Sequence, residues 1–286
     1  MKSVCTIRRA RADDADFVVE LARHEEVEPY LSVASPTTSA AVAEEIERSA
    51  REPHDFGRFV IEVDGARAGA MMFEAANRRS RIAKLGRLAV HPSFRGAGVA
   101  DHAARLLQRH LVVDLGYHRL ELEVYGFNER AQRHAERAGF KREGARLRAY
   151  WRHGEWTDGV LYGVLADELD VPGDVLMLHD YVGVHNECVR TGDWSTLAEW
   201  FAPGAELAFD GVPVGPFRGC DEIAAAYAAR PPDDEVLTFA VEEDGPRLVA
   251  RYGWRQEPAV VAGRMVVVPA DGRIASLLVT FDDAAG

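Results

Sequence analysis

Hydrophobic residues in the first half of the chain follow two alternating patterns. Short runs of β-branched or alternating apolar residues predict strands, and apolar residues three or four positions apart predict amphipathic helices. The predicted strands lie at residues 5–9, 58–63, 68–74, 82–90 and 119–125, and the predicted helices at 17–22, 41–51, 99–115 and 129–138. Strands and helices in this order predict an α/β layer in which helices flank a mixed sheet.

The second half is arranged differently, with helices first and strands last. Helices are predicted at residues 175–190, 195–201 and 220–229, and strands at 206–210, 236–242, 247–255, 260–268 and 274–281. This order is typical of an α+β domain, in which helices cover an antiparallel sheet. The charged Pro-Gly segment at 168–174 is typical of a linker. We therefore expect a first domain at 1–167 and a second at 175–286.

Charge is divided unevenly between the two halves. The 286 residues carry a net charge of −12, and residues 171–286 hold 8 arginines against 19 acidic residues. Because such an acidic half repels phosphate backbones, the charge argues against nucleic acid as a partner. Lysine makes up only 3 of the 34 Lys and Arg residues, a bias that we attribute to genome composition.

The composition also bears on cellular location and on metals. No apolar run reaches the roughly 18 residues that a membrane span needs, and the N-terminus lacks the apolar core of a signal peptide. Cys5, Cys188 and Cys220 are far apart and odd in number, which indicates a reducing cytoplasm. His179 and His185 lack a third metal ligand. We expect a cytoplasmic protein with no metal and no membrane partner.

The most informative stretch is residues 90–100. A strand ends at Val90, a turn carries Arg95, Gly96 and Gly98, and a helix follows directly. The free N–H groups and the dipole of a helix N-terminus favour an anion there. The glycines allow close approach of the backbone, and the guanidinium suits phosphate oxygens. The pattern predicts a site for a diphosphate-bearing cofactor, although an ordinary tight turn would also explain the glycines.

The stretch after the predicted strand reads Arg95-Gly96-Ala97-Gly98-Val99-Ala100 and follows Leu88-Ala89-Val90-His91-Pro92. With this stretch, residues 4–165 resemble the GNAT superfamily of N-acyltransferases, whose central motif is Arg/Gln-x-x-Gly-x-Gly/Ala after a strand. Its second motif is matched by Asn128, Ala131, Gly139 and Phe140. Both motifs stand in the expected order, and residues 139–144 and 154–158 are similar to a bacterial branch that acts on small amines.

The resemblance implies acetyl-CoA, or another acyl-CoA, as the acyl donor. The N–H groups expected to hold its diphosphate are those of Arg95, Gly96, Ala97, Gly98, Val99 and Ala100. Backbone groups of Leu88 and Val90 would pair with the pantetheine arm like an added strand. Asn128 would bond the arm or order a water near the thioester, and it could also simply cap the following helix.

Direct acyl transfer needs a neutral amine, a donor for the carbonyl oxygen and a proton for the departing thiolate. The resemblance implies an N–H near Val90 as the oxyanion donor. Many relatives place the acid, a tyrosine, seven residues after the motif asparagine, and this chain has Ala135 there. The general acid must therefore come from another residue.

The strand at 119–125 offers substitutes. Its alternation points Glu121, Glu123 and Tyr125 to one face. Glu123 could accept the amine proton, and Tyr125 or Tyr150 could act as the acid. A solvated or ion-paired strand face would equally explain the glutamates. His134 is a further candidate, although a surface position on its helix explains it better.

The expected acceptor pocket lies between the first two helices and the last strands. The loop that would border it contains His24, Glu25, Glu26, Glu28 and Tyr30. These side chains would suit a cationic amine. They would equally suit a solvated helix end, and they do not identify the amine.

The second domain contains a set of residues in a fixed order: Tyr181, Gly192-Asp193, Leu197, Phe201-Ala202, Pro213–Gly219, Ile223, Tyr227 and Gly272-Arg273-Ile274. With these residues, the segment 175–286 resembles the SnoaL-like, nuclear-transport-factor-two-like superfamily, whose fold is a cone of curved antiparallel sheet with helices. Members of that superfamily include enzymes, ligand-binding modules and dimerisation modules. We expect a homodimer formed through the sheet of this domain.

The candidate pocket residues in this second domain are weak indicators of function. Asp210 lies near the position of a catalytic base in some members, but it is shifted by one residue, which would reverse its face. We therefore expect Asp210 in a turn before Gly211. Tyr227, Arg251 and Trp254 could line a pocket, and core packing explains them as well.

Three functions remain open from the sequence. The first is an acyl-CoA-dependent N-acyltransferase that acts on the primary amine of a small molecule. The second is a non-catalytic CoA-binding sensor or assembly protein, suggested by Ala135. The third is a bifunctional enzyme with additional chemistry in the second domain.

Overall fold

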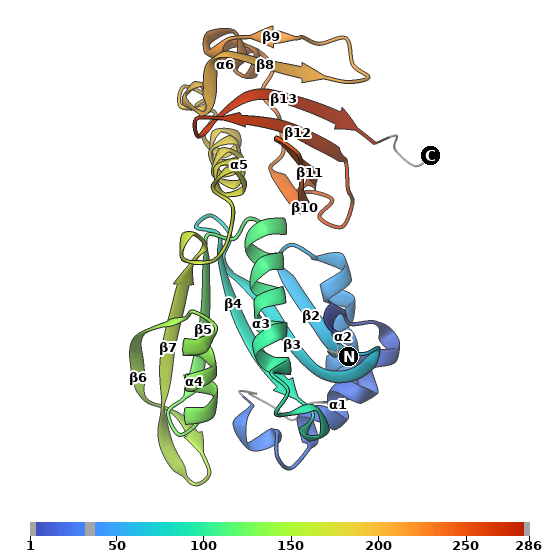
Figure 1. Ribbon diagram of the computed structural model, residues 1–286, viewed down its shortest axis with the longest axis vertical. Coiled ribbons are helices and arrows are strands. Elements are labelled where there is room, and N and C mark those ends of the chain that lie inside the picture. The colour runs from blue at the N-terminus through green and yellow to red at the C-terminus, as the bar shows by residue number, and fades with distance from the viewer. Residues whose placement is uncertain (1–3, 32–37, 283–286) are drawn as a thin grey trace. The chain divides into compact units, whose positions relative to one another are not determined.

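The computed structural model describes residues 4–31 and 38–282, and the chain forms two compact units (Figure 1). The first unit comprises residues 1–112 and 117–169, and the second comprises 113–116 and 170–286. The main division therefore falls within the segment at 168–174. Residues 32–37, between the first two predicted helices, lie outside the described residues.

The first unit is built on a seven-stranded sheet in the order β1-β2-β3-β4-β5-β7-β6. All neighbouring strands are antiparallel except the central pair β4 and β5, which is parallel. The strands are β1 (Cys5–Arg9), β2 (Phe56–Val63), β3 (Ala66–Asn77), β4 (Ile82–Val90), β5 (Arg119–Tyr125), β6 (Lys141–Arg152) and β7 (Glu155–Leu165).

Helices cover both faces of this sheet. They are α1 (Ala15–Arg23), α2 (Ser39–Arg51), α3 (Val99–Arg109) and α4 (Glu129–Arg137), with short 3₁₀ turns at Ala12–Asp14, Glu28–Tyr30, Pro92–Phe94 and Ala166–Glu168. Val60 of β2 packs with α1 and α2 in one buried cluster. The next side chain back, Phe59, points the other way and contacts His110, directly after α3. Strand alternation thus separates an α1/α2 face from an α3 face.

The predicted elements of the first half are largely confirmed, with two differences. The helix predicted at 99–115 is α-helical only to Arg109 and continues as a π-helix, His110–Asp114. Leu111, Val112 and Val113 are all buried, and one face of an α-helix cannot bury three consecutive residues. The hairpin of β6 and β7 carried no strand prediction, because most of β6 is exposed and lacks an alternating apolar pattern.

The second unit contains a six-stranded sheet in the order β10-β11-β12-β13-β8-β9. Its strands are β8 (Phe201–Phe209), β9 (Phe217–Arg218), β10 (Val236–Asp244), β11 (Arg247–Trp254), β12 (Gly263–Ala270) and β13 (Arg273–Phe281). The helices are α5 (Gly173–Thr191), a 3₁₀ helix (Leu197–Trp200) and α6 (Cys220–Ala229). The predicted elements are present, but β8 begins five residues earlier than predicted and ends before Asp210.

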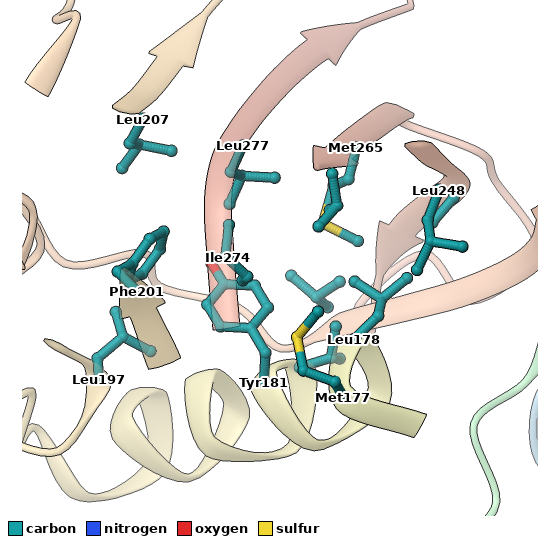
Figure 2. Close-up of a cluster of buried hydrophobic side chains, with 14 of the residues drawn as sticks. Met177, Leu178, Tyr181, Leu197, Phe201, Leu207, Leu248, Met265, Ile274 and Leu277 are labelled. Carbon is teal, nitrogen blue, oxygen red and sulfur yellow. The ribbon is translucent and has the colours of Figure 1, made fainter. Parts of the chain in front are cut away.

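The core of the second unit is apolar and continuous across its sheet. Leu207, Leu248, Val267 and Leu277 form a buried row through direct strand pairing. Figure 2 shows α5 beneath this sheet, with Leu178 and its neighbours pointing toward the strands. No helix in the described part of the chain is long and apolar enough to cross a membrane.

Candidate functional site

The central parallel strands of the first unit separate along their length. β4 pairs with β5 only over Ile82–Leu85, opposite Arg119–Leu122. β4 nevertheless remains paired with β3 up to Val90, and β5 remains paired with β7 up to Tyr125. The strands therefore diverge at their carboxyl ends, and the edge of β4 beyond Leu85 has no strand partner on the β5 side. Such an edge can accept an extended ligand by backbone pairing.

A β-bulge lies where the two strands separate. Arg87 and Leu88 of β4 together face the single residue Met71 of β3, and Arg87 has φ +51°. A positive φ is uncommon for any residue other than glycine, and bulges redirect a strand and its side chains. The guanidinium of Arg87 reaches the carboxylate of Glu45 on α2, which holds the bulge against the α1/α2 face.

The separation opens a cleft with a volume of about 1070 Å³. Both walls, β4 and β5, contribute to it. Of the residues predicted to bind the cofactor, those that line the cleft are Leu88, Val90, Arg95, Ala100 and Asn128. All three predicted catalytic candidates, Glu123, Tyr125 and Tyr150, line it as well.

The turn after β4 has the backbone geometry of an anion site. Gly96 and Gly98 have φ values of +86° and +72°, which glycine adopts without strain. Gly98 is the N-cap of α3, and the carbonyl oxygen of Gly98 accepts the N–H of His102 at 3.0 Å. This is the first hydrogen bond of the helix. The backbone N–H groups of the residues before His102 therefore do not take part in the hydrogen bonds of α3. Gly96, Ala97 and Gly98 are exposed there, and Val99 is buried.

The side chain of Arg95 is partly committed to other groups. Its Nε donates to Val90 O at 3.2 Å, and one terminal nitrogen lies 2.7 Å from Glu26 Oε2. The guanidinium therefore ties the loop after α1 to the end of β4. It remains at the cleft, but Glu26 competes with any anion for it.

Asn128 caps α4, which is one of the roles expected for it from the sequence. Its Oδ1 accepts the N–H of Ala131 at 3.1 Å. Asn128 also borders the cleft, so capping leaves its side-chain amide nitrogen at the cavity wall. The same helix contributes Ala135, which is only 1% exposed and lines the cleft at the position where many relatives carry tyrosine.

His134 is more enclosed than a free surface residue. Its Nδ1 lies 2.6 Å from Asp101 Oδ1, and Arg137 lies 3.2 Å from the same oxygen. Burial would raise the pKa of Asp101, but the hydrogen bonds from Arg137 and His134 outweigh it and lower that pKa. His134 therefore connects α4 to the first turn of α3.

Glu123 and Tyr150 form a directly bonded pair on the α1/α2 side of the cleft. The Tyr150 hydroxyl donates to Glu123 Oε1 at 2.7 Å, and the Glu123 side chain is only 9% exposed. Burial and the adjacent Glu123 carboxylate raise the pKa of Tyr150. Two cations face Glu123 Oε2: Lys84 Nζ at 3.5 Å and Arg146 at 3.6 Å.

Gly159 of β7 provides the space for this pair. A Cβ at this position would lie 2.1 Å from Glu123 Oε1 and 2.7 Å from Cε2 of Tyr150. At distances this short, an added Cβ would displace the Glu123 carboxylate and the Tyr150 ring from their present positions. Lys84 and Gly159 were not identified from the sequence. Both depend on strand pairing between distant segments.

Tyr125 belongs to an aromatic group that lines the cleft. Its ring stacks on Phe127 at 5.4 Å and meets Tyr150 edge-on at 5.2 Å. The Arg152 guanidinium lies 5.5 Å from the ring centroid. Among the described residues, the Tyr125 hydroxyl has no hydrogen-bond partner, which distinguishes it from the hydroxyl of Tyr150.

The expected acceptor loop is present at the cleft, but its acidic residues are mostly paired. Glu26 bonds Arg95, and Glu28 lies 3.5 Å from Arg152. Glu25 is exposed and lines the cleft. The remaining two members contact aromatic rings: His24 meets His91, and Tyr30 meets Phe127. The loop therefore carries less uncompensated negative charge than its sequence indicates.

The second unit does not bring its pocket candidates together. Asp210 is exposed after the end of β8, directly before Gly211 with φ +78°, so it is a turn residue. Arg251 is exposed on the face of β11 opposite the buried Tyr252. Arg251 therefore does not share a face with Tyr252, and its pocket role stays a prediction.

The other two candidates pack in the core of the second unit or against it. Tyr227 stacks on Trp194 with centroids 5.0 Å apart, and its hydroxyl lies 3.0 Å from that of Tyr181. Trp254 packs edge-on against Tyr252. The described part of the chain contains no group of three or more His, Cys, Asp or Glu side chains that could hold a metal ion.

Comparison with known proteins finds relatives of the first unit. Residues 5–141 match the family model described as an acetyltransferase (GNAT) domain. The chain is 30% identical over 84 residues to an uncharacterized N-acetyltransferase derived from the SPbeta prophage of Bacillus subtilis, covering 29% of this chain and 48% of that protein. It is 29% identical over 103 residues to spermidine N(1)-acetyltransferase of Escherichia coli K12, covering 36% and 55%. The chain thus spans about half the length of these curated relatives.

A solved structure matches a larger share of the chain. Spermidine N-acetyltransferase from Vibrio cholerae, in complex with CoA and spermine, superimposes with a TM-score of 0.52 at 22% identity. The match covers 57% of this chain and 96% of that protein. At this identity the likeness shows the fold. Residues 5–141 therefore match a GNAT acetyltransferase domain, which supports that part of the predicted resemblance.

Proposed function

We propose that the first unit transfers the acetyl group of acetyl-CoA directly to the primary amine of a small molecule. The observation that carries this proposal is the open edge of β4 beside a cleft, followed at once by the glycine turn of α3. A strand edge and an anion-binding turn in series suit a ligand with an amide-containing arm and a diphosphate. The curated relatives named as acetyltransferases support the same chemistry.

The cofactor would lie along β4. The backbone N–H groups of Arg95, Gly96, Ala97, Gly98, Val99 and Ala100 hold the diphosphate at the start of α3. Leu88 and Val90 pair through their backbone with the pantetheine arm. The side-chain amide of Asn128 bonds the arm from the opposite wall. Acetyl-CoA supplies the activated acetyl group, and the residues supply binding, orientation and proton transfer.

The acceptor would enter from the α1/α2 face, where Glu123 points. Glu123 accepts a proton from the amine, directly or through a water molecule, and a backbone N–H near Val90 stabilises the carbonyl oxygen. Tyr125, whose hydroxyl is not engaged by a described residue, donates a proton to the departing thiolate. Tyr150 positions Glu123 by its hydrogen bond. These roles compensate for Ala135.

The direct test measures release of free CoA from acetyl-CoA across a broad panel of amines, including polyamines and amino acids. We expect turnover with at least one amine. If tight acetyl-CoA binding occurs without turnover for any amine, the sensor hypothesis, which Ala135 favours, replaces this proposal.

A binding test addresses the diphosphate site. Because hydrogen bonds to charged groups contribute about 1.5–3 kcal/mol, Arg95→Ala is expected to weaken CoA binding by roughly 10- to 100-fold in calorimetry. Glu26→Ala is the matched control, since it removes the competing carboxylate and should leave affinity equal or higher. Unchanged affinity in Arg95→Ala would exclude the Arg95 guanidinium from the cofactor site.

For the second unit we propose a SnoaL-like fold and self-association through its sheet. The outer face of this sheet supports the second point: Ala208, Val249, Val266 and Leu278 pair across four strands as a partly exposed apolar row. Light scattering should show a dimer, and Val266→Lys should yield a monomer; a wild-type monomer would contradict self-association.

The three free cysteines support a cytoplasmic location.

A further inference from the structure

Lysine is rare in this chain, yet one lysine lines the cleft beside Glu123. We call this part of the cleft, around Glu123 and Tyr150, its acceptor half. The sequence has 3 lysines among 34 Lys and Arg residues. Lys84 lines the cleft, and Lys141 pairs with Glu168 on the surface with a side chain that is 69% exposed. Whatever the origin of the arginine bias, the primary amine at Lys84 is chemically different from the guanidinium groups around it, because an ammonium group can lose its proton and become a nucleophile.

The strand register places Lys84 at the closed end of the gap between β4 and β5. Lys84 is opposite Glu121, one position before the last parallel pair, Leu85 and Leu122. Its cross-strand neighbour on β3 is Glu74. The ε-amine of Lys84 is therefore located where the two strands begin to separate, on the same face as Glu123.

The surroundings of Lys84 suit attack on a thioester. Its side chain is 41% exposed, and Nζ lies 3.5 Å from Glu123 Oε2. The proposed general base is thus the carboxylate nearest to this amine. Gly86 follows two residues later on the same face of the strand, and a Cβ built there would meet nothing within 4 Å. At this position between Lys84 and Leu88, β4 therefore presents no side chain to the cleft.

We propose that Lys84 is a site of self-acetylation, in which the first unit transfers the acetyl group of its own acetyl-CoA to the Lys84 ε-amine. This inference rests on the acetyl-CoA binding and acetyl transfer of the proposed function, and not on its small-molecule acceptor. Nζ forms a bond to the carbonyl carbon, and the carbon–sulfur bond breaks with its electron pair leaving on sulfur. Glu123 takes the amine proton, and the thiolate receives a proton from Tyr125. The products are Nε-acetyl-lysine and free CoA.

Self-acetylation would change the electrostatics of the acceptor site. Of the two cations that face Glu123, only Arg146 would remain charged. The acceptor half of the cleft would become more negative by one charge. The modified chain should therefore favour cationic acceptors more strongly than the unmodified chain.

The test incubates the full chain with acetyl-CoA in the absence of added amine and follows acetylation by intact mass and peptide mapping. We expect one acetyl group on Lys84, with a rate constant independent of protein concentration because the transfer occurs within one molecule. Lys84→Arg should abolish the label while keeping the charge. Glu123→Gln should slow labelling at least about 100-fold. Lys141 is the internal control for non-enzymatic acetylation.

The outcomes separate this inference from the proposed function. A preparation that acetylates an added amine but leaves Lys84 unmodified overturns the inference alone. Labelling of Lys141 as fast as Lys84 also overturns it, because exposure alone would then explain the label. Labelling of Lys84 without turnover of any added amine supports the inference and overturns the small-molecule function.

Discussion

The sheets of the two units differ at their centres. In the first unit the parallel strands β4 and β5 stay paired for only four residues and then diverge around a charged cleft. In the second unit the parallel pair β13 and β8 lies within a sheet whose inner row, from Leu207 to Leu248, is fully buried. In the first sheet, the loss of pairing between β4 and β5 leaves a strand edge open for binding. In the second sheet, the paired strands carry the buried core.

Because of this difference, we expect reactive groups in the cleft of the first unit and a mainly structural role for the core of the second unit. The cleft contains Glu123, a carboxylate that is 9% exposed and faces two cations and a tyrosine. Groups arranged in this way are typical of catalytic sites. The interior of the second unit contains aliphatic and aromatic residues (Figure 2). A substitution in the cleft should therefore change kinetics, and a substitution in the second core should change unfolding.

Glu123→Gln should have the largest effect. The amide keeps the shape of the side chain and can still accept the Tyr150 hydroxyl, but it cannot act as a base. We expect kcat/KM to fall about 10²- to 10⁴-fold with unchanged CoA affinity. Glu121→Gln is the matched control on the same strand face, where the carboxylate is 37% exposed and pairs with Arg119 at 3.1 Å. Equal losses in both variants would refute a specific role for Glu123.

Leu277→Ala tests the structural role of the core of the second unit. Leu277 is 1% exposed in the core of the second unit. Removing its buried methyl groups leaves a cavity, so the free energy of unfolding of that unit should fall by about 2–5 kcal/mol in calorimetry. Acetyl-transfer kinetics below the transition temperature should stay unchanged. Leu278→Ala, one residue later on the partly exposed outer face, should cost less. A comparable loss there would show that the outer face is also covered.

The cofactor half of the site was predictable from sequence because it is one contiguous segment. Residues 90–100 contain the strand end, the two glycines and the helix start, and each feature follows from local geometry. The left-handed φ values of Gly96 and Gly98 and the N-cap position of Gly98 are consistent with that prediction. Local turn chemistry depends little on the rest of the fold.

The acceptor half could be predicted only in part. Strand alternation put Glu123 and Tyr125 on one face. The bond from Tyr150 to Glu123 depends on the hairpin of β6 and β7, which had no recognisable apolar alternation. The pairing of Glu26 with Arg95 joins residues 69 positions apart. Such contacts are set by tertiary packing and leave no periodic signal in the sequence.

Gly159→Ala should sharpen the assignment of chemistry to the Glu123–Tyr150 pair. The added Cβ would lie within 2.1 Å of Glu123 Oε1, so the carboxylate must move. Since small displacements of catalytic groups are costly, kcat should fall about 10- to 100-fold while CoA affinity persists. Gly144→Ala on the adjacent strand β6 is the control, because a Cβ there meets nothing within 4 Å. Full activity of Gly159→Ala would mean that the position of this pair does not limit the reaction.

The smallest expected effect concerns the pH dependence of the second core. His185 is 5% exposed among Trp194 and Tyr227. Burial lowers its pKa below the ordinary value of 6.5, although the hydrogen bond with Asn186 opposes this. The unfolded chain therefore binds a proton that the folded unit excludes, and stability is lost as pH falls below about 6.5, by at most about 1.4 kcal/mol per pH unit. Denaturation at pH 7 and pH 5 should show this slope reduced in His185→Gln. An identical slope in the variant would mean that other groups control the acid sensitivity of the second unit.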